Sequence, residues 1–246
     1  MACSRNFTSV LTVLILAAVE SVKLPSHWAR CKNDTSLNDC LKISIQNAMR
    51  DLGKGNRTLG VQPLDPWKMK LFVYNHGSIS TDLKLTARDV SVIGFKNAKV
   101  DYVRTNWETM DLQINTPKLV LFGKYGVEGR VVFVPIEGKG NFRITIDDLT
   151  SRMKFVFEKY NKKGKEFIRV KESTLVPDAK NISVRFDNLF NGNKDLGNRM
   201  NDLINRNWRF ILNTLQPIGL KSMAAPVKIV VNELFSRVPA SDFIIS

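Results

Sequence analysis

The order of two hydrophobic periodicities along the chain is the strongest constraint on its fold. Between Met69 and about Phe186, short apolar runs alternate with polar residues at a period of two and are separated by glycine, asparagine and charged turns, a pattern typical of strands. On both sides of this region apolar residues recur every three or four positions, which indicates helices. Because helices and strands do not alternate, the sequence excludes a doubly wound parallel fold and predicts an α+β domain with an antiparallel sheet.

The predicted helices differ in length. A short one is expected at 41–52, where the apolar residues form a single stripe and glycines follow. A helical period also spans 196–215, and Pro217 is expected to end that helix before a last one that reaches Phe235. The long helix is expected to lie against the sheet in a two-layer domain, or inside a sheet that wraps around it and encloses a cavity.

The first 21 residues have the layout of a secretory signal. Arg5 precedes an apolar run that is too short to span a bilayer. Cleavage is expected after Ser21, with Ala18 as the alternative, so the mature protein is predicted to be one domain at 22–246. We expect it to be secreted and extracellular, because no second long apolar stretch and no Pro/Gly/Ser linker follows.

Three cysteines are present, and one of them, Cys3, lies in the predicted signal. The remaining pair, Cys31 and Cys40, is expected to form a disulfide in an oxidising compartment. A zinc pair is the alternative, but with only His27 and His76 as further ligands the chain offers a poor metal site.

Three sequons follow the predicted signal, at Asn33, Asn56 and Asn181. They predict N-glycosylation and surface positions for these segments.

The formal net charge is +14. The basic residues are spread along the whole chain, so the charge does not predict a nucleic-acid-binding surface. A solvated basic surface is the simplest interpretation, and weak contact with anionic membranes is the other.

The sequence supplies few groups for catalysis. It contains no Gly-x-Ser-x-Gly, no phosphate-binding glycine loop and no His-Glu-x-x-His. His27 and His76 are expected in solvated turns, and Asp147, Asp148 and Asp187 as turn or cap residues. No catalytic residue, metal site or cofactor is therefore predicted.

Several large apolar side chains are expected to face inward. Each can pack a filled core or line a cavity that holds an apolar ligand. These candidate lining residues are Phe133, Phe142, Phe155, Phe157, Trp208, Ile211 and Phe235.

Four stretches carry a resemblance to a known family. They are Cys31 and Cys40 before a helix, the segment 59–66 (LGVQPLDP), Tyr125 with 129–140 (GRVVFVPIEGKG), and 186–208, which begins FDNLFNGN and ends NRNW. In order and spacing they resemble the takeout and juvenile-hormone-binding protein family of secreted insect carriers.

The resemblance implies a long helix wrapped by a highly curved antiparallel sheet, as in tubular lipid-binding (TULIP) proteins, with an apolar tunnel along the helix. It also implies a ligand such as juvenile hormone, another terpenoid or a lipid-like molecule, a disulfide at Cys31 and Cys40, and a Gly-x-Gly turn at 138–140. Hormone binders in the family contribute a tyrosine hydroxyl to the ligand. The sequence does not single out Tyr102, Tyr125 or Tyr160 for that role.

A secreted, non-enzymatic carrier of a small hydrophobic ligand is therefore the expected function. The alternatives are a basic protein that docks on anionic membranes to collect lipid or to act on microbes, an enzyme acting on lipid esters, and a secreted scaffold with a filled core.

Overall fold

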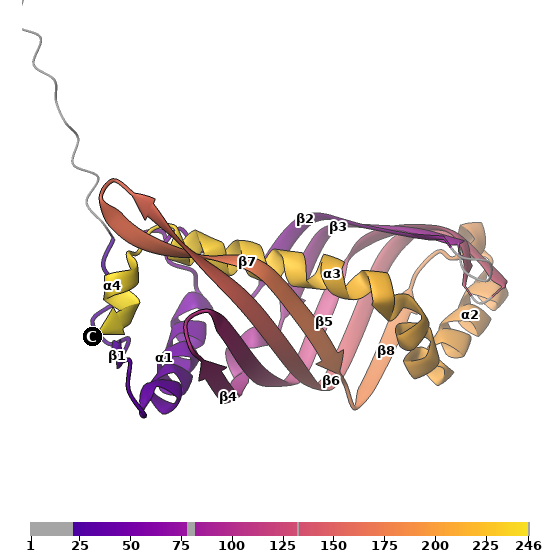
Figure 1. Cartoon of the computed structure of the whole chain (residues 1–246). Helices are drawn as coiled ribbons and strands as arrows, with labels where there is room; N and C mark the ends of the chain where they lie inside the picture. The colour runs from indigo at the N-terminus through magenta and orange to yellow at the C-terminus, as the bar shows by residue number, and fades with distance from the viewer. Residues whose placement is uncertain (1–21, 78–81, 132, 246) are drawn as a thin grey trace, which may run out of the picture.

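A computed structural model of the chain describes residues 22–77, 82–131 and 133–245. The predicted signal at 1–21 lies outside the described residues. Figure 1 shows an elongated molecule in which one long helix runs along the concave side of a strongly curved sheet. The helix α1 and both ends of the described chain lie at one end of the molecule, and α2 lies at the other.

The sheet is antiparallel throughout its described part. Its strands are β2 (Trp67–Gly77), β3 (Asp82–Ile93), β4 (Lys99–Thr105), β5 (Thr109–Val131), β6 (Val134–Lys162), β7 (Lys165–Asp178) and β8 (Asn181–Phe186). The order is β2-β3-β5-β6-β7, with β4 paired to β5 and β8 paired to β6. The predicted antiparallel α+β architecture is confirmed.

The helices are α1 (Leu37–Leu52), α2 (Lys194–Arg206), α3 (Trp208–Phe235) and α4 (Ala240–Phe243), with short 3₁₀ turns η1 (Phe95–Asn97) and η2 (Phe190–Gly192). The predicted first helix is confirmed, although it begins four residues earlier than its apolar stripe. Its last residue, Leu52, precedes Gly53 as expected.

The predicted end of the long helix at Pro217 is wrong. The break lies ten residues earlier, at Asn207, where φ is −116° and ψ is 19°. The side-chain Nδ2 of Asn207 donates to the carbonyl of Leu203 at 2.8 Å, which satisfies a helix-end acceptor. From Trp208 the helix continues through Pro217 to Phe235. Its packing along the sheet compensates for the hydrogen bond that a proline cannot make.

Helix side chains hold three strands by pairing with backbone groups on their free edges. In α3, Asn232 accepts from the Val170 N–H of β7 at 2.7 Å and donates to the Val170 carbonyl at 3.2 Å. In α2, Asn201 pairs in the same way with Phe186 of β8, and Asn205 with Val184. In α1, Gln46 joins the Val100 N–H and the Ala98 carbonyl at β4. These carboxamides stand in for a neighbouring strand.

The predicted Gly-x-Gly turn at 138–140 is wrong, because both glycines lie inside β6. The connection between β5 and β6 lies instead between Val131 and Val134. The glycines are needed for space. A Cβ on Gly140 would stand 2.5 Å from the Asp187 carbonyl oxygen. Only glycine therefore lets the segment after β8 lie this close to β6.

The adjacent aspartates also lie inside β6 and not in a turn. Asp148 has a φ of 49° and interrupts the regular strand, while the register with β5 is the same on both sides of it. Its carboxylate lies 3.8 Å from the Lys180 Nζ, and the Asp147 carboxylate accepts from Asn181 at 3.3 Å. Asp187 lies in a bend directly after β8, as expected.

The two histidines have different surroundings. His27 lies in a turn and pairs with the Asp51 carboxylate. His76 lies within β2 and not in a turn, one residue before the strand ends. Among the described residues, no group of three or more His, Cys, Asp and Glu could hold a metal ion. No helix of the described part is long and apolar enough to cross a membrane.

Cys31 and Cys40 form the predicted disulfide, with an S–S distance of 2.10 Å and Cα atoms 5.7 Å apart. The bridge ties the start of α1 to β1 (Cys31–Lys32), which pairs in parallel with β9 (Ile244–Ile245). The N-terminal segment, α1 and the end of the chain are therefore fastened together at one end of the sheet.

We expect Asn232→Ala to lower the free energy of unfolding by about 2–4 kcal/mol. The change leaves the N–H and carbonyl of Val170 without their partner, and Val170 is buried. Chemical denaturation would measure the loss. The control is Asn198→Ala on the exposed face of α2, which should change stability by less than about 0.5 kcal/mol. Equal losses in both variants would contradict the role given to Asn232.

Candidate ligand-binding cavity

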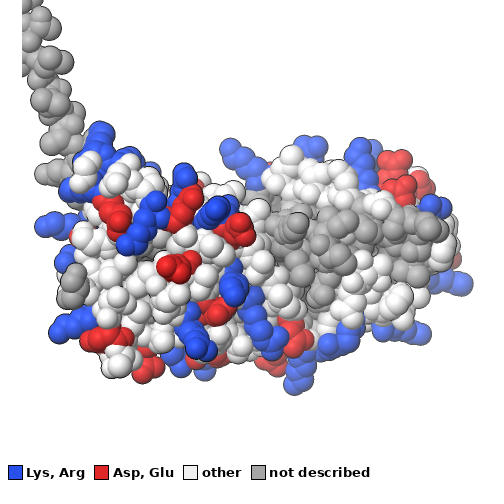
Figure 2. All heavy atoms as spheres, viewed as in Figure 1, with Lys and Arg blue, Asp and Glu red and all other residues white. Residues whose placement is uncertain are grey.

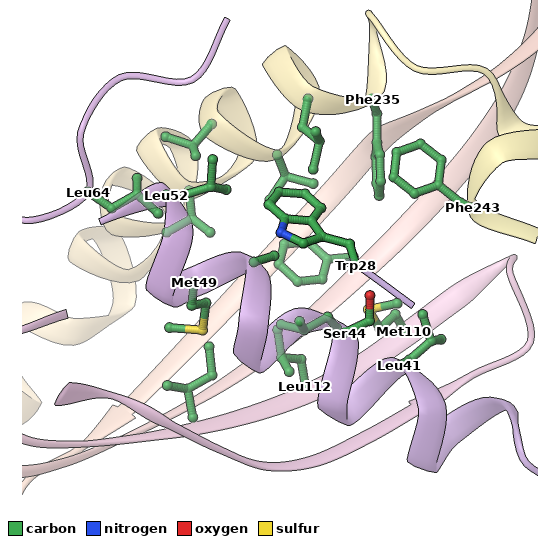
Figure 3. Close-up of a pocket in the computed structure, with 18 of the residues that line it drawn as sticks. Trp28, Leu41, Ser44, Met49, Leu52, Leu64, Met110, Leu112, Phe235 and Phe243 are labelled. Atoms are coloured by element: carbon green, nitrogen blue, oxygen red, sulfur yellow. The ribbon is translucent and has the colours of Figure 1, made fainter. Parts of the chain in front are cut away.

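A cavity of about 280 Å³ lies between α1, α3 and the concave face of the sheet, at the end of the molecule that carries the disulfide. Figure 3 shows side chains from α1, β5 and the C-terminal segment converging on it, among them Leu41, Met49, Met110, Leu112 and Phe243. The volume lies just below the ~300–1,000 Å³ that is usual for small-molecule sites.

The α1 wall comes from the apolar stripe that the sequence showed. It consists of Leu41, Ser44, Ile45, Ala48, Met49 and Leu52. The sequence predicted this helix and its apolar stripe but did not assign them to the site, and the helical period was the signal that pointed to this face. The period shows that the face is buried, but it does not distinguish a filled core from a cavity wall.

The other walls come from the sheet and from the last two helices. Residues at alternate positions on β5 and β6 face the cavity, because side chains of a strand point to the same side every second residue. The residues are Met110, Leu112, Ile114, Phe155 and Phe157 on strands, and Val227, Val230, Val231, Leu234, Phe235 and Phe243 on α3 and α4.

Three of the seven predicted lining residues lie on this wall, namely Phe155, Phe157 and Phe235. Their rings pack against one another: Phe157 and Phe235 have centroids 5.8 Å apart in an edge-to-face arrangement, and Phe235 meets Phe243 at 4.9 Å. Such contacts fix the ring positions. That these residues contact a ligand stays a prediction.

The structure places the other four away from this cavity. Phe133 is 66% exposed at the connection between β5 and β6. Phe142 is buried in a separate cluster that includes Phe186. Trp208 packs on the same cluster, and Ile211 lies one turn further along α3 and is half-buried. A hydrophobic period of two or 3.6 residues indicates that a side chain faces inward. It does not indicate at which end of this long molecule the side chain lies.

The polar groups of the cavity wall are mostly engaged elsewhere. The Ser44 hydroxyl donates to the carbonyl of Ala29 at 3.0 Å. The indole N–H of Trp28 donates to the Asp51 carboxylate at 2.6 Å. This bond, followed by the one from His27, holds the pKa of Asp51 below its ordinary value.

The tyrosines that the resemblance brought forward lie elsewhere. Tyr125 donates its hydroxyl to the Asp187 carbonyl at 2.7 Å, and burial followed by the nearby Asp187 charge raises its pKa to about 12. Tyr102 is largely exposed, and Tyr160 stacks on Phe167. None of the three is among the described residues that line the cavity.

The sequon asparagines differ in exposure. Asn33 and Asn181 are exposed, whereas Asn56 is half-buried and its side-chain oxygen accepts from the Leu59 N–H at 3.0 Å. Glycosylation at these three positions stays a prediction.

Comparison with known proteins identifies the family. The model of the haemolymph juvenile hormone binding protein family matches residues 9–245. The chain belongs to this family. The resemblance seen in the sequence is therefore confirmed, and the match covers nearly the whole chain.

Two relatives and one solved structure align with this chain over most of their length. The circadian clock-controlled protein daywake of Drosophila melanogaster is 25% identical over 232 residues, which covers 89% of this chain and 87% of the relative. The Drosophila yakuba protein of that name is 22% identical over 230 residues, with the same coverage. The crystal structure of Epiphyas postvittana Takeout 1 matches with a TM-score of 0.76 at 21% identity and covers 88% of this chain and 99% of that one. The predicted TULIP-like fold is confirmed.

The lowered pKa of Asp51 makes its contribution to stability depend on pH. A carboxylate with a depressed pKa stabilises the folded protein above its unfolded pKa of about 4, and this stabilisation is lost as the pH falls through the folded value. We expect Asp51→Asn to lower stability by about 0.5–1 kcal/mol at pH 7, a small amount because the carboxylate is partly exposed. Thermal unfolding from pH 7 to about pH 2.5 would measure the difference, which should become smaller as the pH falls. A constant difference would contradict this role.

Proposed function

We propose that this family member is a secreted carrier that encloses one small, single-chain hydrophobic molecule, such as juvenile hormone, another terpenoid or a fatty compound. The observation that supports the proposal best is the cavity beside α1, whose wall is apolar along almost its whole extent. Its volume of about 280 Å³ suits a single chain better than a lipid with several. The name of the family points to the same class of ligand.

Desolvation would supply the binding energy. Burying about 400 Å² of hydrocarbon at ~25 cal/mol per Å² gives at most about 10 kcal/mol. Lost translational and rotational freedom reduces this value considerably. Affinities between micromolar and nanomolar are then reachable without an ionic contact.

Three features support secretion. The first 21 residues have the layout of a signal, Cys31 and Cys40 are joined in a disulfide, and sequons follow the signal. The family description also names the haemolymph.

Native mass spectrometry of the secreted protein, followed by organic extraction, would test carriage directly. We expect a stoichiometric terpenoid or fatty compound to travel with the protein. A protein that arrives empty, and stays empty after incubation with juvenile hormone and with long-chain lipids, would contradict the proposal.

A matched pair of variants on β6 would test the site. Phe157 is 8% exposed on the cavity wall, and Phe142 is 7% exposed in the other cluster. Both Phe→Leu variants should lose similar stability, because each removes a well-packed ring. Only Phe157→Leu should also change ligand affinity, by a factor of about 5–10, as measured by displacement of a fluorescent apolar probe. Equal affinity changes in both variants would place the ligand elsewhere.

One observation favours a second candidate function, docking on anionic membranes. Apolar side chains are exposed together near one groove at the α2 end, where Phe133, Val134, Leu196 and Leu203 lie. The net charge of +14 would attract an anionic bilayer. Figure 2 shows Lys and Arg along the whole visible face, interspersed with Asp and Glu, so attraction would be diffuse on that face.

Sedimentation with phosphatidylserine vesicles would test this candidate. Docking predicts binding that weakens as salt rises and that Phe133→Ser reduces several-fold. Phe122→Ser is the control, because Phe122 is an exposed aromatic residue on β5 whose chain neighbours do not line the groove, whereas Phe133 directly precedes Val134 of the groove. No vesicle binding at low salt would exclude the candidate.

A further inference from the structure

Trp107 is the buried polar group of the described cavity wall that has no hydrogen-bond partner. Its side chain lines the cavity and is only 8% exposed. Among the described residues, its indole Nε1 is the one buried side-chain nitrogen or oxygen without a hydrogen-bond partner. A buried donor left unsatisfied is costly, and such groups in folded proteins call for an explanation.

The backbone holds Trp107 in an unfavourable conformation. Its φ is 67°, in the left-handed region that a large side chain rarely adopts. The Trp107 N–H donates to the Thr105 hydroxyl at 3.0 Å, and the Thr105 N–H donates to Asn38 of α1 at 3.0 Å. On the other side, the Glu108 carbonyl accepts from the Phe157 N–H at 2.8 Å. The connection between β4 and β5 is therefore held by hydrogen bonds to α1 and to β6. Backbone strain that is held in place in this way is typical of functional sites.

The second indole on the α1 side of the cavity provides a contrast. Trp28 also lines the cavity, but its N–H is bound to the Asp51 carboxylate. The Ser44 hydroxyl is likewise engaged by a backbone carbonyl. Of the buried donors in the described wall, Trp107 is thus the one that an acceptor could satisfy without breaking a hydrogen bond of the protein.

We propose that the Trp107 indole N–H binds a neutral oxygen acceptor of the ligand, and so stabilises a bound apolar chain that bears an ester, ketone or aldehyde carbonyl but not a plain hydrocarbon. The assignment rests on the carrier function proposed above. A neutral acceptor is favoured over a carboxylate because no Lys, Arg or His side chain is among the described residues that line the cavity, and an unpaired buried charge is costly.

The test compares methyl dodecanoate with pentadecane, two chains with the same number of non-hydrogen atoms. Displacement of a fluorescent apolar probe gives both affinities. The quantity compared is the ratio of the ester affinity to the pentadecane affinity, because the two chains differ in their cost of leaving water. Trp107→Phe keeps an aromatic ring but removes the donor, so this ratio should fall about 5–10-fold relative to the wild-type protein. In Trp28→Phe, the control, the ratio should stay close to the wild-type value.

A second measurement does not depend on the Trp107 variant. The chain has four tryptophans, so the indole region of a ¹H–¹⁵N spectrum should show four side-chain signals. Methyl dodecanoate should move the Trp107 proton downfield, and pentadecane should not. The signal can be assigned from Trp→Phe variants at the other three positions.

The outcomes separate the two proposals. If Trp107→Phe leaves the ratio of ester to pentadecane affinity unchanged, the assignment of Trp107 is overturned and the carrier function stands. If the wild-type protein binds neither ligand, both proposals are overturned.

Discussion

Carboxamide side chains that pair with strand edges determine how this molecule is assembled. Asn232 of α3, Asn201 and Asn205 of α2, and Gln46 of α1 each bond to both an N–H and a carbonyl at the edge of a strand. An edge strand carries unpaired backbone groups that would otherwise be solvated or recruit another chain. These bonds satisfy backbone groups at the edges of β4, β7 and β8, and they fix α1, α2 and α3 beside those strands.

The two ends of the molecule are packed differently. Near α2, rings such as Phe142, Phe186 and Trp208 pack into one cluster, and the groove beside α2 lies at the surface. Near α1, side chains of the helix and of the sheet leave a cavity of about 280 Å³ between them. The disulfide, the β1–β9 pair and Gln46 all hold α1 in place. Because the helix is anchored independently of the cavity, it does not need to collapse onto the sheet.

Several errors of the sequence reasoning have one cause. Pro217 was expected to end a helix, and the glycines at 138 and 140 to form a turn, because each residue type has that effect in isolation. In the structure a helix passes through Pro217, while Gly140 lies in a strand where the Asp187 carbonyl passes too close for a side chain. Local preferences of about 1–3 kcal/mol are overridden when tertiary packing contributes more.

The sequence by itself determined the α+β class, the first helix, the extent of the strands, the Cys31–Cys40 bridge and the family, because all of these depend on local periodicity and on residue order. It also indicated which faces are buried, including Phe155, Phe157 and Phe235. Only the tertiary structure decided that these faces meet around a cavity, that Phe133 lies outside it, and that Trp107 contributes an unpaired donor. The physical reason is that a period reports the direction of a side chain but not its distance from the opposite wall, which is set by how helices and sheet are held apart.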